Sequence, residues 1–352
     1  FFFKQKTAYE IKECDWSSDV CSSDLYDFRV PRHSQKINMK RAPLELSRLS
    51  LGTAPLAGLF TSVKDEESDA LIQTSLAQGI NYFDTAPLYG HGSAETRLGR
   101  ILRNVKEPFV LETKVGRILK TVEQAEPVPW FPDADPHIEP VFDYSRDGIL
   151  KSFEDSLNRL GVSHIDIALM HDCENHVREA IESAYPVLHT LKTQGIIKAI
   201  GVGLNFPDIA MQIMSEVDLD IALIAGRYTL LDQSAQRELL PYALEKEVDI
   251  TIGGVFNSGV LANPVKGATF EYLPASDEII AKAQKIGAFL KARGISLTAA
   301  ALQFPLRHPA VTSVLTGSRN SAELLSNIKD FDAELPENIW RELEDAQLIE
   351  RL

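Results

Sequence analysis

The chain has 352 residues, of which 44% are hydrophobic and 24% charged, which suffices to bury the core of one large domain or two smaller ones. Its formal charge of -14 argues against a surface for nucleic acid or anionic membranes, because both are polyanions. No apolar run approaches the roughly 18 residues of a membrane span, and no signal-peptide core follows the opening phenylalanines. We therefore expect a soluble cytoplasmic protein that acts on a small molecule.

Residues 1–25 differ from the rest of the chain. The segment FFFKQKTAYEIKECDWSSDVCSSDL shows neither helical nor strand periodicity, and it contains Cys14 and Cys21, two of the three cysteines. A disulfide framework is therefore not expected. The segment looks like translated sequencing-adapter read-through, and a disordered natural tail is the alternative. We assign 1–25 to a non-native or disordered extension and 26–352 to the folded domain.

Short β-branched apolar runs alternate with longer amphipathic stretches, which is the pattern of β/α units. Eight runs are predicted to be strands, at residues 50–55, 81–87, 109–115, 165–171, 198–205, 221–228, 249–256 and 312–318. Eight helices are predicted from apolar spacings of three and four, at residues 65–79, 93–104, 145–161, 178–195, 207–217, 234–247, 276–294 and 320–331. Several of them end on a glycine suited to a left-handed cap: Gly79, Gly161, Gly195 and Gly294.

Eight strand–helix pairs in roughly 300 residues, with no Pro/Gly/Ser-rich linker between them, predict a single (β/α)8 TIM barrel. Two connections are longer than usual. Residues 116–144 carry five prolines together with Trp130 and Phe131, which we expect to contact substrate, and residues 257–276 follow the seventh strand. Both would lie at the carboxyl ends of the strands, where barrels of this class build their sites.

Polar residues stand at the ends of three predicted strands. Asp84 ends the second strand and Tyr89 follows it by one turn, Lys114 lies near the end of the third, and His171 ends the fourth. Each alone has an ordinary structural explanation, such as a turn former, a snorkelling lysine, a packed phenol or a core histidine. Together they fit one mechanism. Ionisable side chains that point into the barrel at this face must either be paired with an opposite charge or take part in the chemistry of the site.

In that mechanism the Lys114 ammonium lowers the pKa of the Tyr89 phenol from its reference of ~10, and Asp84 keeps Lys114 charged. Tyr89 then becomes a proton donor or acceptor near neutral pH. A neutral His171 would hydrogen-bond the oxygen of a reacting carbonyl or alcohol and orient it toward Tyr89.

Five segments carry a resemblance to a known family. They are GINYFDTAPLYG, SAETRLG, LETKVG, DSLNRLGVSHIDIALMHD and VLTGSRNSAELLSNI, and the resemblance covers nearly all of residues 42–352. The chain resembles the aldo-keto reductases. This implies that Asp84, Tyr89, Lys114 and His171 form a catalytic tetrad, and that a nicotinamide cofactor binds extended across the barrel mouth. The chain has no GxGxxG motif after a strand, since GVGLNF has only two of the three glycines.

The resemblance also implies cofactor-binding residues. Asn205 would hydrogen-bond the carboxamide, or would instead cap the helix that starts at 206 or 207. Gly253 stands where the family has an aromatic that stacks on the nicotinamide. The pyrophosphate loop would contain Phe256, Asn257 and Ser258.

The adenosine end would be Thr316 to Arg319 together with Glu323 and Asn327, at the start of the last predicted helix. Gly317 and Ser318 fall within this stretch, and Gly317 and Glu323 occupy positions where NADP-selective members have basic residues. A carboxylate repels a 2′-phosphate, so of NAD and NADP we expect NAD, although Arg319 favours NADP.

Within the family, the 116–144 insert and the segments MHD and AGRYTLLDQ resemble the aldose 1-dehydrogenase group, which includes L-fucose, D-threo-aldose and pyridoxal dehydrogenases. The expected reaction is hydride transfer between an aldose or similar hemiacetal and the cofactor, giving a lactone. Alternatives are a general aldehyde or ketone reductase and a non-catalytic nucleotide-binding regulatory subunit. A metal-dependent barrel hydrolase using the histidine, acid and cysteine side chains of 171–176 is a further alternative, although one loop supplies too few ligands, so no metal is expected.

Overall fold

The structure is a computed structural model that describes residues 30–352. Both the 1–25 extension and its boundary with the folded domain lie outside the described residues. Within the described part, Pro31–Leu352 form one unit. No helix in this part is both long and apolar enough to cross a membrane.

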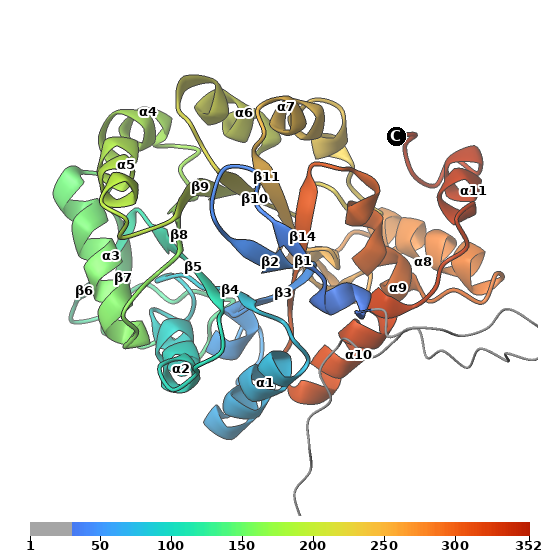
Figure 1. Cartoon of the computed structure of the whole chain (residues 1–352). Coiled ribbons are helices and arrows are strands. Elements are labelled where there is room, and N and C mark those ends of the chain that lie inside the picture. The colour runs from blue at the N-terminus through green and yellow to red at the C-terminus, as the bar shows by residue number, and fades with distance from the viewer. Residues whose placement is uncertain (1–29) are drawn as a thin grey trace, which may run out of the picture. The chain divides into compact units, whose positions relative to one another are not determined.

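Eight parallel strands close into a barrel, and the predicted TIM barrel is confirmed (Figure 1). All eight predicted strands are present, and most are shorter than predicted by one to four residues. Around the barrel they are β3 (Leu49–Gly52), β4 (Tyr82–Asp84), β5 (Val110–Val115), β8 (Ile167–His171), β9 (Ala199–Leu204), β10 (Ile221–Ala225), β11 (Asp249–Gly253) and β14 (Val311–Gly317). Pairing of β14 with β3 closes the ring.

Helices surround the strands (Figure 1). The predicted helices are found as α1 (Asp65–Ala77), α2 (Ser93–Leu102), α3 (Arg146–Leu160), α4 and α5 (Val177–Glu179 and Tyr185–Thr193, joined by a π-helical turn), α6 (Pro207–Glu216), α7 (Leu239–Glu245), α8 (Asp277–Lys291) and α10 (Ser321–Asp332). The four predicted capping glycines all have left-handed backbones, with φ of 79°, 61°, 73° and 73°. Two helices were not predicted, α9 (Leu297–Gln303) and α11 (Ile339–Asp345), because each is only two turns long.

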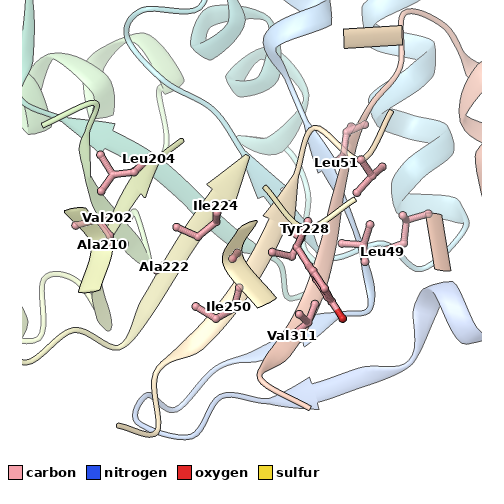
Figure 2. Packing of buried hydrophobic residues seen from close by; sticks show 14 of the residues in the cluster. Leu49, Leu51, Val202, Leu204, Ala210, Ala222, Ile224, Tyr228, Ile250 and Val311 are labelled. Atoms are coloured by element: carbon pink, nitrogen blue, oxygen red, sulfur yellow. The ribbon is translucent and has the colours of Figure 1, made fainter. Parts of the chain in front are cut away.

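Successive strand residues face opposite sides of the barrel wall. One set packs outward under the helices, as Figure 2 shows for Leu49 and Leu51 of β3 and for Val202 and Leu204 of β9. The other set fills the interior with a smaller apolar cluster that includes Tyr82, Val110, Ile167, Leu169 and Leu223. The period of two therefore places Asp84, Lys114 and His171 on the interior face, at the carboxyl end of the barrel.

Three antiparallel hairpins were not predicted. β1 (Lys36–Asn38) and β2 (Glu45–Ser47) pair, and their connecting loop adds apolar side chains to the interior cluster from the amino end. Each long connection also contains one: β6 (Arg117–Thr121) pairs with β7 (Ile138–Phe142), and β12 (Thr269–Phe270) pairs with β13 (Leu273–Pro274). These two hairpins follow the carboxyl ends of β5 and β11, so they stand on the side of the barrel where the polar residues lie.

Candidate active site at the barrel mouth

The four predicted catalytic residues converge on the mouth of the barrel. Asp84 is the last residue of β4, Lys114 the penultimate residue of β5 and His171 the last residue of β8. Tyr89 lies on the turn after β4, where its backbone N–H donates to the Ala86 carbonyl at 3.1 Å. Strand alternation and one tight turn thus bring together residues that are far apart in the sequence.

Asp84 and Lys114 form a fully buried ion pair. The ammonium also donates to the Thr85 carbonyl at 2.9 Å. Burial opposes the charge on Lys114, but the attraction of the paired Asp84 carboxylate contributes most to raising the pKa of Lys114 above its ordinary value. A glycine makes room for this side chain, because a Cβ at Gly203 would lie 3.3 Å from Lys114 Cε. Lys114 is therefore charged at any pH at which the protein works.

Tyr89 lies against this pair, with the Lys114 Nζ atom 4.8 Å from the ring centroid. Burial raises the pKa of the Tyr89 phenol, Lys114 lowers it, and Asp84 raises it again, so the net shift is upward. The predicted lowering below ~10 is therefore wrong for the free protein, because desolvation of the phenolate exceeds the attraction of the ammonium. Tyr89 is a protonated phenol at neutral pH, with a cation beside it that favours its ionisation.

His171 also packs against Tyr89, with ring centroids 6.0 Å apart and planes at 89°. Burial lowers the pKa of His171 to about 3, although Asp172 opposes the shift, so the imidazole is neutral as predicted. Its Nδ1 atom is buried and has no hydrogen-bond partner in the described part of the chain. A neutral imidazole can hydrogen-bond a substrate oxygen without adding charge.

Two further polar residues at the mouth were not predicted as site residues. Asp172 follows His171 with a left-handed φ of 48°, and its carboxylate accepts from Arg117 at 2.7 Å. The guanidinium of Arg117 in turn lies 3.9 Å from the ring centroid of Phe142. The acidic residue next to His171 was visible in the sequence, but the partner from β6 depends on the hairpin.

Tyr272 is the main residue that the sequence did not reveal. It sits at the tip of the β12–β13 hairpin, where Glu271 and Tyr272 have φ of 50° and 64°, as in a two-residue turn that normally uses Asn or Gly. The turn is held by the Tyr272 N–H, which donates to Ser258 Oγ at 3.1 Å, and by the ion pair of Glu271 with Arg227. Strained turns of this kind are common at functional sites.

Tyr272 is 46% exposed and lines the opening of the barrel mouth beside Tyr89. Burial raises the pKa of the Tyr272 phenol, Asp172 raises it further, and Lys114 lowers it, so the hydroxyl lies in the field of the catalytic residues. The ring packs 6.0 Å from both Phe60 and Trp130. An aromatic cluster from three loops therefore borders the opening.

The predicted substrate residues take different positions. Phe131 is buried and packs against Tyr89 at 6.3 Å between ring centroids, so it helps to hold the Tyr89 ring in place. Trp130 lies on the rim beside Tyr272. Neither Trp130 nor Phe131 lines the groove that runs along the barrel mouth.

A groove of about 410 Å³ runs from Tyr89 to the start of α10. Five glycines line it, Gly52, Gly253, Gly254, Gly259 and Gly317, and a Cβ at Gly317 would lie 2.5 Å from Pro55 Cγ. Phe256 and Ser258 also line it. A narrow groove with bare backbone walls suits an extended dinucleotide, whose phosphates can approach main-chain N–H groups closely. At Gly253, where the family has an aromatic, the groove has no side chain.

Asn205 lies beside this groove, in a smaller cavity of about 240 Å³ that also contains Asn257 and Tyr272. Helix α6 has Phe206 at its N-cap and no side-chain cap bond, so Asn205 does not cap it. Asn257 Oδ1 is buried without a hydrogen-bond partner among residues 30–352, while Asn257 Nδ2 donates to the Gly226 carbonyl at 3.3 Å. An unsatisfied acceptor here fits a site that receives a polar ligand group.

The predicted adenosine end lies at the other end of the groove, before α10. Asn327 Nδ2 donates to the Ser318 hydroxyl at 3.1 Å, which fixes the loop onto the helix. Arg319 Nε donates to Glu323 Oε1 at 2.9 Å, and the Arg319 backbone N–H donates to Oε2 at 2.9 Å. Glu323 was expected to repel a 2′-phosphate as a free carboxylate. It is instead paired with Arg319, whose positive charge matches its own negative charge.

The histidine and cysteine side chains of 171–176 do not gather around a common point. Cys173 is buried, and burial raises the pKa of its thiol to about 12. The His176 ring packs 4.9 Å from Phe142. Residues 30–352 contain no group of three or more His, Cys, Asp or Glu side chains placed to hold a metal ion.

Comparison with known proteins agrees with this geometry. The chain is 38% identical over 336 residues to pyridoxal 4-dehydrogenase of Microbacterium luteolum, which covers 90% of this chain and 98% of that protein. It is 37% identical to D-threo-aldose 1-dehydrogenase of a Pseudomonas species, covering 88% and 96%. Both relatives carry dehydrogenase names.

Solved structures agree on the fold. The glycerol dehydrogenase of Gluconobacter oxydans superposes with a TM-score of 0.70 at 23% identity, covering 91% of this chain and 97% of that chain. The holo form of an aldo-keto reductase from Bacillus halodurans gives 0.72 at 21%, covering 90% and 97%. A model of the Aldo/keto reductase family matches residues 48–347. The chain therefore belongs to the aldo/keto reductase family of oxidoreductases, whose members use nicotinamide dinucleotides.

Proposed function

We propose that the protein oxidises the cyclic hemiacetal of an aldose, or of a similar hydroxyaldehyde such as pyridoxal, to a lactone. The observation that carries the proposal is that the Lys114 ammonium and the uncharged His171 ring both lie against the Tyr89 ring. This set can move one proton at an alcohol oxygen without metal ligands. The two dehydrogenase relatives, matched over almost their whole length, support the substrate class.

In the proposed reaction the anomeric hydroxyl lies between Tyr89 and His171. Tyr89 as phenolate accepts the hydroxyl proton while the C1–H bond breaks and a C1=O bond forms, and the ring oxygen stays in place, so that the product is a lactone. His171 hydrogen-bonds the same oxygen and orients it. Lys114 stabilises the phenolate, and Asp84 keeps Lys114 in position. A nicotinamide dinucleotide, when bound in the groove, supplies the hydride acceptor.

We further propose NAD as the preferred dinucleotide. Because Glu323 already matches the charge of Arg319, a 2′-phosphate at this end of the groove would meet a neutral pair rather than a free cation. The carboxylate would also be placed to accept from a ribose hydroxyl.

One observation favours a second candidate, a general aldehyde or ketone reductase. Burial raises the pKa of Tyr89, and a protonated phenol is the form that reduction needs, since it donates a proton to the carbonyl oxygen. Oxidation requires the phenolate. The two directions therefore differ in their pH dependence.

A spectrophotometric screen tests the proposal. A panel of aldoses and pyridoxal is offered with NAD and with NADP, the reduced cofactor is followed, and the product is analysed for a lactone. We expect lactone formation with at least one of these substrates, and its loss in Tyr89→Phe. Reduction of simple aldehydes without oxidation of any panel member would select the reductase, and cofactor binding with no turnover in either direction would select a non-catalytic nucleotide-binding protein.

A further inference from the structure

Glu112 is a fully buried carboxyl inside the barrel to which the proposed reaction assigns no role. It lies on β5, two residues before Lys114, so both side chains face the interior. In the β4–β5 pairing it stands directly opposite Asp84. Two acidic side chains therefore share one face of adjacent strands, next to a single ammonium.

The hydrogen bonds around Glu112 involve only one of its two carboxyl oxygens. The Tyr82 hydroxyl donates to Glu112 Oε2 at 2.7 Å, and the same hydroxyl lies 3.5 Å from Thr251 Oγ1. Glu112 Oε1 has no donor in the described part of the chain. The register of β4 and β5 places this carboxyl beside that of Asp84 on the interior face. Two ionised carboxylates repel and cannot bond to each other, so a hydrogen bond between them requires a proton.

The charges decide which carboxyl holds that proton. Lys114 donates directly to Asp84, whereas within residues 30–352 no lysine or arginine donates to Glu112. The titratable groups that act on Glu112 are Asp84, Lys114 and Tyr82. Burial raises the pKa of Glu112 well above its ordinary value, and Asp84 adds to the shift, while Lys114 opposes it. One anion and one cation remain in the cluster.

We propose that Glu112, as a neutral carboxylic acid, is a positioning residue that donates a hydrogen bond to Asp84 and holds that carboxylate against Lys114. The role rests on the proposed function, because it acts through Lys114 on the proton transfer at Tyr89. An ionised Glu112 would add a second negative charge beneath Lys114 and offset the ammonium's effect on the phenol. The protonated form leaves the ammonium free to stabilise the phenolate.

The protonation state is measured directly by infrared difference spectroscopy of the wild type against Glu112→Gln at neutral pH. We expect the wild type to show the C=O stretching band of a protonated carboxyl, and the variant to lack it. Glu95→Gln is the matched control, since Glu95 is equally buried but forms an ion pair with Arg159 at 2.6 Å, and its replacement should remove carboxylate bands instead. Loss of carboxylate bands in Glu112→Gln, as in the control, would overturn the proposal whether or not the protein oxidises sugars.

The positioning role is tested by two variants compared at equal fold content by circular dichroism. Glu112→Leu removes the donor to Asp84 and should lower kcat roughly tenfold, leave KM within about threefold, and move the pH dependence of oxidation to more alkaline values. Glu112→Gln keeps a neutral donor and should recover most of that loss. Equal losses and equal pH shifts in the two variants would show that Glu112 only fills space.

Discussion

Arg319 and Glu323 bind each other through three hydrogen bonds at the start of α10: the guanidinium donates twice to Oε1, at 2.9 and 2.5 Å, and the Arg319 backbone N–H donates to Oε2 at 2.9 Å. The pair lies where the groove ends, at the position expected for the adenosine ribose. Both side chains are partly exposed, at 52% and 34%, so solvent screens their charges. Cofactor choice therefore depends on the pair and not on either residue alone.

Breaking the pair should shift cofactor preference. Glu323→Gln removes the carboxylate and leaves the Arg319 guanidinium available to a 2′-phosphate, so the ratio of kcat/KM with NADP to that with NAD should rise about tenfold. Steady-state kinetics with both cofactors measure the ratio. Glu66→Gln on α1 is the control. It also removes one exposed negative charge, and it should leave the ratio unchanged. A wild type that already prefers NADP would show that another basic group reaches the phosphate.

Tyr89→Phe should reduce turnover at least a hundredfold and leave cofactor affinity nearly intact. The phenol is required for proton transfer, whereas the adenosine end of the groove is remote from it. Stopped assays measure turnover, and fluorescence titration with reduced cofactor measures binding. Retention of a tenth of the wild-type rate would remove Tyr89 from the role of acid or base.

The rate of oxidation should increase with pH. Burial raises the pKa of Tyr89, so the phenol is protonated at neutral pH and the phenolate that oxidation needs forms only in the alkaline range. Reduction, which needs the phenol, should be active at neutral pH and fall as Tyr89 ionises. The pH profiles of kcat in the two directions check this, and an oxidation rate that is flat from neutral to alkaline pH would contradict it.

Lys114→Met should move the oxidation profile to still higher pH or abolish activity. The variant removes the one cation that lowers the pKa of Tyr89, while the burial that raises it remains. It also leaves Asp84 buried without its partner, so thermal melting must be measured alongside. A folded variant with the wild-type pH profile would show that Lys114 does not act on the phenol.

Tyr272→Phe should raise KM for a polyhydroxylated substrate about fivefold and change kcat little. Tyr272 lines the mouth, where its hydroxyl can bond a substrate hydroxyl away from the reacting carbon. The ring, which packs on Phe60 and Trp130, is retained in the variant. Tyr242→Phe on α7 is a matched control. A simple aldehyde lacking other hydroxyls should show no KM change, and an equal change for both substrates would assign Tyr272 to packing only.

The sequence by itself determined the architecture and the four central residues. Apolar periodicity located the eight strands, because alternation and strand-to-helix spacing are local properties of the chain. Asp84, Lys114 and His171 fall at strand ends, so their convergence follows from the closure of a parallel barrel. The alternation of side chains along LETKVG also places Glu112 on the same face as Lys114. The sequence therefore indicates that Glu112 points into the barrel, but it does not show which residue Glu112 contacts.

The tertiary structure decided the properties that depend on distance and burial. The pKa of Tyr89 is raised because desolvation outweighs the attraction of Lys114, and residue types alone do not give the size of either effect. Glu323 is neutralised by Arg319, which only the geometry of the loop before α10 establishes. Tyr272 reaches the mouth at the tip of a short hairpin. The turn residues of this hairpin lack the usual glycine or asparagine, so the local sequence did not predict the turn. Spacing along the chain fixes which residues share a face, whereas charge and protonation depend on neighbours that folding brings together.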